Sequence, residues 1–75
     1  MFDKKVFALR LLELRKLQKL SQAQIADVLG VTFHQISKME KADRGPSVEV
    51  LCALADYFDV SLDYLVGRSD DPKRY

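Results

Sequence analysis

The sequence predicts an all-α fold, a compact domain of five short helices. Every apolar run repeats at three- and four-residue spacing, which is the pattern of one helix face. Before each run stands a residue able to cap a helix N-terminus: Asp3, Ser21, Thr32, Ser47 and Ser61. The chain has only 75 residues, so we expect a single domain with a small core.

Composition excludes several classes of protein. Cys52 is the only cysteine, so an internal disulfide is impossible, and one Cys with one His is too few for a zinc site of the usual ligand count. No apolar stretch approaches the roughly 18 residues of a membrane span, and no signal-peptide pattern is visible. We therefore expect a cytoplasmic protein with no metal and no cofactor. We expect Cys52 to be a small core residue rather than a redox switch.

The charges are unevenly distributed although the net charge is only +1. Residues 1–45 hold nine Lys or Arg against five Asp or Glu, a net charge of +4. Residues 46–75 hold three against six, a net charge of −3. Affinity for phosphate depends on where cations sit, so a polarised domain can bind nucleic acid at near-zero net charge. An uneven solvated surface with no such role explains the distribution equally well.

The first predicted helix spans about residues 3–18, with Asp3 as its N-cap. Helical spacing places three apolar residues on one stripe: Phe7, Leu11 and Leu14. Three further leucines widen this stripe beyond one buried face: Leu9, Leu12 and Leu17. They would cover a partner subunit or the C-terminal tail, or complete the local core.

Residues 21–41 predict two short helices joined by a tight turn at Gly30, where glycine adopts a left-handed conformation without strain. The apolar residues of both helices fall on inward faces: Ile25, Ala26, Leu29, Val31, Ile36 and Met39. The second helix keeps hydrogen-bonding, basic and aromatic side chains for its outer face: Phe33, His34, Gln35, Ser37, Lys38 and Lys41. A helix with these two faces is suited to the DNA major groove.

A loop at residues 41–45 precedes Pro46, and Ser47 is the predicted N-cap of a fourth helix that ends near residue 58. We expect its buried residues to be Val48, Leu51, Leu54, Ala55 and Phe58. Ser61 would cap a short fifth helix with Leu62 and Leu65 in the core, ending at Gly67. The sequence thus divides into a helical domain at residues 1–67 and a flexible polar tail at 68–75.

Several short sequence motifs resemble the lambda-repressor-like helix-turn-helix family, which includes phage Cro and repressor proteins and many small bacterial regulators. The matching motifs are LRK at 14–16, LSQ at 20–22, IADVLGV at 25–31, QISKMEK at 35–41, PS at 46–47 and VSLDYLVG at 60–67. They occur in family order and spacing, and cover nearly all of residues 7–67.

The resemblance implies roles for particular residues. Gln22 matches a position that contacts a DNA phosphate and braces the recognition helix, and Arg15 and Glu40 match an ion pair between the first and third helices. Side-chain chemistry adds that Gln35 can pair with adenine and that Lys38 can meet guanine or phosphate. The expected DNA-binding residues are Gln22, Thr32, Phe33, His34, Gln35, Ser37, Lys38, Lys41 and Arg44.

Three of these assignments have alternatives. Phe33, where the family usually has a polar residue, would contact a thymine methyl group, pack as core or dock a protein. His34 would donate to guanine N7 or phosphate, or be an exposed residue without a task. Arg44 would meet the DNA backbone or the minor groove, or be a surface cation without a contact to DNA. The family also usually has Gly where this chain has Lys19 and Ala42, so each is strained in a left-handed turn or the turn differs.

These observations predict a sequence-specific regulator of transcription, specifically a repressor, that binds double-stranded DNA as a homodimer on a pseudo-palindromic operator. The alternative is a protein-interaction module, such as an antitoxin or anti-repressor, with its own protein partner. We do not expect an enzyme and name no catalytic residues, because the carboxylates are scattered and no glycine-rich phosphate loop is present. Residues considered for a dimer surface are Tyr57, Tyr64, Val66, Tyr75 and the three extra leucines.

Overall fold

Five helices form in the predicted order in the computed structural model, which describes residues 2–74. They are α1 (Lys4–Leu17), α2 (Gln22–Leu29), α3 (Phe33–Glu40), α4 (Val48–Phe58) and α5 (Leu62–Leu65). No strand occurs within residues 2–74, so the all-α prediction is confirmed. Within the same residues, no helix combines the length and the apolar character that crossing a membrane requires.

Each helix begins at the residue predicted to cap it. The Asp3 carboxylate accepts a hydrogen bond from the Lys5 backbone N–H at 2.9 Å, and the four hydroxyl caps accept from the third residue of their helices. In α2 and α3 a glutamine at that third position also accepts from the backbone N–H of the cap residue. These two capping boxes fix where α2 and α3 start, and therefore the direction in which each points.

Five residues in turns have positive φ within residues 2–74, among them Gly67 with φ 83°. Gly30 has φ 68°, as predicted, and Asp59 ends α4 with φ 55°. Lys19 (φ 58°) and Ala42 (φ 61°) are also left-handed, in the two turns where the family usually has glycine. The turns thus keep the left-handed geometry and retain the strain of a Cβ atom, about 1–2 kcal/mol at each residue.

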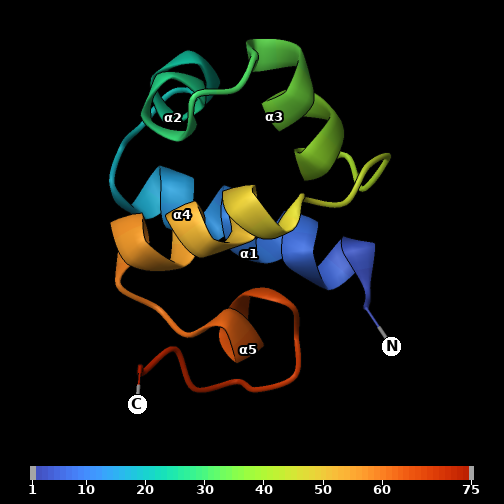
Figure 1. The fold of residues 1–75 in the computed structure, drawn as a ribbon, viewed down its shortest axis with the longest axis vertical. Coiled ribbons are helices and arrows are strands. Elements are labelled where there is room, and N and C mark those ends of the chain that lie inside the picture. Colours follow the sequence, from blue (N-terminus) through green and yellow to red (C-terminus); the bar gives the residue numbers. More distant parts are fainter. Residues whose placement is uncertain (1, 75) are drawn as a thin grey trace.

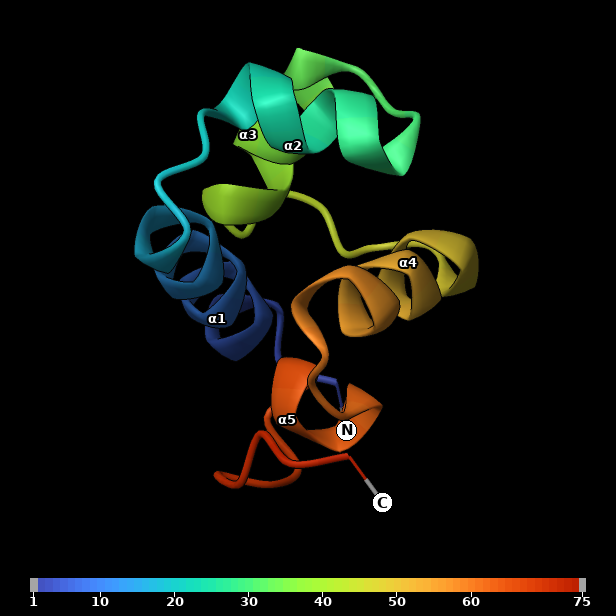
Figure 2. The same cartoon turned by 90° about the vertical axis from the view of Figure 1, so that its left-hand side faces the viewer.

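The helices enclose one core. Figure 2 shows α1 and α4 on either side of it, with α2 and α3 covering one end and α5 the other. The buried core residues come from every helix and from the turn after α4: Phe7, Leu11, Ile25, Ala26, Ile36, Met39, Leu54, Ala55, Phe58, Val60 and Leu65. The α2–α3 pair therefore forms one pole of a molecule that measures 28 × 23 × 20 Å.

Three residues expected in the core are instead exposed. Val48 is 78% exposed and Leu62 is 44% exposed, and the Cys52 side chain is exposed on α4. Val48 and Leu62 are the first residues of their helices, where the chain enters from a loop and no neighbouring helix covers them. Cys52 lies one turn before the buried Ala55, at the edge of the buried stripe of α4, and its side chain remains exposed there. All three expectations of burial were wrong.

Residues 68–74 pack against the domain through several hydrogen bonds. The guanidinium of Arg10 donates to the carbonyl oxygens of Tyr64 and Ser69, both at 2.9 Å, and lies 4.0 Å from the centre of the Tyr64 ring. The Ser61 N–H donates to the carbonyl oxygen of Pro72 at 2.9 Å. This segment is therefore tied to α1 and α5 more closely than its polar sequence suggested.

Candidate nucleic-acid interface

The two sides of α3 differ in burial and chemistry. Ile36 is fully buried and Met39 is 3% exposed, so this side of the helix is held in the core. Phe33, His34 and Lys38 are exposed on the other side. No other helix covers that side, because α2 and α3 form one pole of the molecule (Figure 1). The exposed side of this short helix carries an aromatic ring, an imidazole and a cation.

A partly buried polar network fixes the far end of α3. Arg15 Nε donates to Glu40 Oε2 at 2.6 Å and Arg15 Nη2 to Glu40 Oε1 at 3.0 Å. Gln22 Nε2 donates to Glu40 Oε1 at 2.8 Å, and Arg15 Nη1 donates to the Leu20 carbonyl at 2.9 Å. The network joins α1, the turn before α2, the first residue of α2 and the last residue of α3. It contains the ion pair that the family resemblance implied.

Gln35 has a structural task that its expected role as a base reader did not include. Its Oε1 accepts from the Thr32 N–H at 2.8 Å, while the Thr32 hydroxyl accepts from the Gln35 N–H at 3.2 Å. Because this contact requires the oxygen, the amide NH₂ is the part of Gln35 that remains as a donor. A bidentate pair with adenine needs the oxygen as well as the NH₂. To pair with adenine in this way, Gln35 Oε1 would therefore have to accept a second hydrogen bond or give up the one from the Thr32 N–H.

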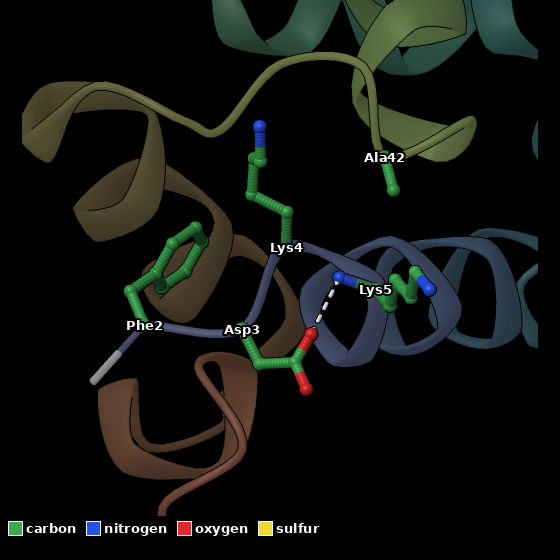
Figure 3. A pocket seen from close by; sticks show the side chains of 5 residues that line it. All are labelled: Phe2, Asp3, Lys4, Lys5 and Ala42. Carbon is green, nitrogen blue, oxygen red and sulfur yellow. Dashed lines mark hydrogen bonds between the residues drawn. The ribbon is translucent and has the colours of Figure 1, made fainter.

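The loop after α3 carries two exposed cations, Lys41 and Arg44. Gly45 in this loop lies against the Phe2 ring, and a Cβ atom on Gly45 would lie 3.1 Å from Phe2 Cε2. Figure 3 shows Lys4 extending toward the same loop, above an open hollow of about 530 Å³ that Phe2, Lys4 and Ala42 help to line. The N-terminal segment thus supports the loop that presents Arg44.

The structure brings some predicted site residues together and leaves others apart. Gln35 and Arg44 line one small hollow of about 50 Å³ beside Ser47, the N-cap of α4. Thr32 is exposed at the start of α3, whereas Gln22 and Ser37 are half-buried. Gln22 lies with Glu40 at the other end of α3. Phosphate-contacting and base-contacting candidates therefore lie along the whole length of α3 and at both of its ends.

Two positioning features were missed from the sequence. The capping glutamines Gln24 and Gln35 could have been found, because Ser or Thr followed three residues later by Gln is a capping-box spacing. The Phe2–Gly45 contact could not have been found, because it joins residues far apart in the chain. The capping glutamines fix the starts of α2 and α3, and the Phe2–Gly45 contact supports the loop after α3.

The residues considered for a dimer surface divide into two groups. Tyr57, Leu9 and Leu17 are exposed, Leu17 by 79%. Tyr64 packs on the core and under Arg10, and Leu12 and Val66 are half-buried. Tyr75 lies outside the described residues. The leucines of α1 that widen its apolar stripe are thus only partly used by the local core.

Comparison with known proteins places this geometry in a family. The family model described as Helix-turn-helix (HTH_3) matches residues 11–65. Among curated relatives, the HTH-type transcriptional regulator AnsR of Bacillus subtilis is 44% identical over 59 residues, covering 79% of this chain and 51% of AnsR. The uncharacterized HTH-type transcriptional regulator YobD of the same organism is 36% identical, covering 89% of this chain and 60% of YobD. The chain thus spans about half the length of these relatives.

One solved structure allows the fold to be compared directly. The P22 c2 repressor, crystallised in complex with a synthetic operator, superposes with a TM-score of 0.79 at 31% identity, covering 85% of this chain and 97% of that protein. The family match includes the second half of α1, both helices of the helix-turn-helix, and all of α4 and α5. This chain belongs to the lambda-repressor-like helix-turn-helix family.

Proposed function

We propose that this protein is a sequence-specific, double-stranded DNA-binding regulator of transcription that acts as a repressor. The observation that carries the proposal is that α3 is buried on one side only. Ile36 and Met39 hold that side in the core, and Phe33, His34 and Lys38 are exposed on the other. The first residues of α3 would contact base edges in the major groove. The protein would occlude the promoter and would act where the DNA is, in the cytoplasm.

The flanking groups would supply affinity that does not depend on sequence. Lys38, Lys41 and Arg44 are exposed cations on α3 and in the loop after it. Gln22 is the first residue of α2, and the N-terminus of a helix favours an anion. The Gln22 amide would contact a phosphate while it also donates to Glu40. Neutralising phosphates releases counterions, so binding would weaken steeply as salt is added.

The proposal includes a twofold dimer on a pseudo-palindromic operator. One small domain buries too little surface for tight specific binding, and half-sites lie about 34 Å apart when one helical turn of DNA separates them. The longest dimension of this domain is 28 Å, so two copies at that spacing fit side by side.

The test is selection of bound sequences from a random duplex pool at low salt, followed by titration of the selected site. A selected motif with twofold symmetry supports both operator recognition and dimer formation. Lys38→Ala should weaken binding to all sequences and reduce the salt slope by about 1 if Lys38 meets a phosphate. Glu13→Gln, which changes an exposed charge on α1, is the control and should leave the sequence preference unchanged.

A protein-interaction module remains the second candidate, because Leu9 and Leu17 are exposed beside an incompletely used apolar stripe. Absence of any DNA binding at low salt, together with a protein that co-purifies in fixed ratio, would favour this candidate over the regulator.

A further inference from the structure

Phe33 is the one strongly apolar side chain on the exposed side of α3 within the described residues. It is the first residue of the helix and is 49% exposed. The capping box at Thr32 fixes the backbone immediately before it, and the His34 ring lies edge-on with ring centres 5.7 Å apart and planes at 71°. Phe33 is therefore held on the outer surface and does not pack as core.

Building on the proposed function, we propose that Phe33 determines specificity by contacting the 5-methyl group of thymine in the major groove. A phenyl ring has no hydrogen-bonding group, so it cannot read the donors and acceptors of a base edge. The thymine methyl is the one apolar group that the four bases present in the major groove. A ring at the N-terminus of the recognition helix lies where base edges are reached.

The surroundings of Phe33 favour a methyl group over a protein partner. Its exposed neighbours on α3 and at the cap, Thr32, His34 and Lys38, are polar, so α3 itself offers no second exposed apolar side chain beside the ring. A protein-docking surface usually presents a contiguous apolar area of several hundred Å². A single methyl group needs only one ring.

The experiment begins with the selected operator and replaces each thymine by deoxyuridine, which removes only the methyl group. Wild-type protein should bind about fourfold more weakly when one particular thymine of a single half-site is replaced. This factor corresponds to about 0.8 kcal/mol, the value of one buried methylene-sized group, with 1.4 kcal/mol per tenfold. Cytosine at that position should weaken binding, and 5-methylcytosine should restore part of the loss relative to cytosine.

Three variants connect the effect to Phe33. Phe33→Ala should bind more weakly and lose the sensitivity to deoxyuridine, whereas Phe33→Leu should keep much of it. Leu17→Ala, which removes from α1 an apolar side chain that is 79% exposed against 49% for Phe33, should retain the full fourfold effect. Circular dichroism of each variant verifies that it is folded.

Each other result has a distinct meaning. If no thymine is sensitive while a specific operator is still bound, or if Phe33→Ala keeps the wild-type sensitivity, the methyl contact is wrong and the proposed function stands. If Phe33→Ala instead leaves DNA binding unchanged and releases a bound protein, the docking role replaces the methyl contact. If wild-type protein selects no sequence at low salt, both the contact and the proposed function fail.

Discussion

Arg15 and Glu40 form a two-pronged ion pair in which both side chains are nearly buried, with 13% and 6% of their surfaces exposed. The pair joins α1 to the last residue of α3, and Gln22 adds a third donor to the same carboxylate. Burial makes such a pair sensitive to the loss of one partner, because the remaining charge loses its counter-charge in a largely desolvated place.

Glu40→Ala should lower the free energy of unfolding by about 3 kcal/mol, since it leaves the largely buried Arg15 with a carbonyl oxygen but no counter-charge. Urea denaturation followed by circular dichroism measures the change. Replacing both residues, as Arg15→Met with Glu40→Leu, should recover much of the loss because an apolar pair of similar size needs no counter-charge. Asp70→Ala is the control: its carboxylate pairs with Arg10 in full contact with solvent, and its removal should change stability little. Equal effects at Glu40 and Asp70 would contradict the structural role of the network.

Gly30→Ala and Gly67→Ala should differ in cost although both glycines are left-handed. A Cβ atom on Gly30 meets nothing within 4 Å, so only backbone strain of about 1 kcal/mol is expected. A Cβ atom on Gly67 would lie 2.7 Å from Val6 Cγ1, and Val is stiff at χ1, so overpacking adds about 1–3 kcal/mol. Chemical denaturation of both variants measures the difference. In the Gly67→Ala, Val6→Ala double variant, the two losses should be less than additive because the clash is gone.

Lys19→Gly and Ala42→Gly should each stabilise the protein. Releasing left-handed strain gains about 1–2 kcal/mol, and the added freedom of the unfolded chain returns about 0.4–1 kcal/mol. The net gain of about 0.5–1 kcal/mol raises the melting temperature by roughly 2–8 °C for a domain of this size. Asp59→Gly should give a smaller rise, because Asp tolerates this conformation better than Lys or Ala. Unchanged or lower melting temperatures for Lys19→Gly and Ala42→Gly would argue against the left-handed turns.

Gln35→Ala should lower stability by about 1 kcal/mol, because the Thr32 N–H loses its acceptor. Gln35→Glu keeps an acceptor at the same place and should retain the stability of the wild type. The same glutamate lacks the amide donor and adds a negative charge, so it should still weaken binding to DNA. Gln24→Ala removes the equivalent contact from α2 and is the matched control: it should lower the stability by a similar amount. A Gln35→Ala protein as stable as wild type would show that the cap contributes nothing.

Cys52 should react fully with a thiol reagent in the folded protein, because its side chain is exposed on α4. Titration with Ellman's reagent in native buffer should release one equivalent of chromophore, as in denaturant. Reaction that begins only once denaturant is added would instead place the thiol in the core.

The helices and their order were predictable because caps and periodicity are local properties of the sequence. Asp3, Ser21, Thr32, Ser47 and Ser61 all act as the predicted caps. The exposure of Val48, Leu62 and Cys52 was not predictable in the same way. It depends on where neighbouring helices stop, and periodicity reports which residues share a face but not how much of that face is covered.

The candidate site divides similarly. The uncovered side of α3 follows from its apolar spacing, and the resemblance supplied the Arg15–Glu40 pair. The capping contact of Gln35 and the support that Phe2 gives to the loop at Gly45 depend on three-dimensional proximity. These are the contacts that decide which atoms of the exposed residues are available to a ligand.

Residues 68–74 are fastened beside α5, at the pole farthest from α2 and α3 (Figure 1). In the proposed complex with a duplex, a dye or affinity tag attached beside residue 74 would sit on the outward side, away from the grooves. Immobilisation through such a tag would leave the exposed side of α3 accessible. DNA affinities measured on a sensor surface should therefore agree with affinities measured in solution.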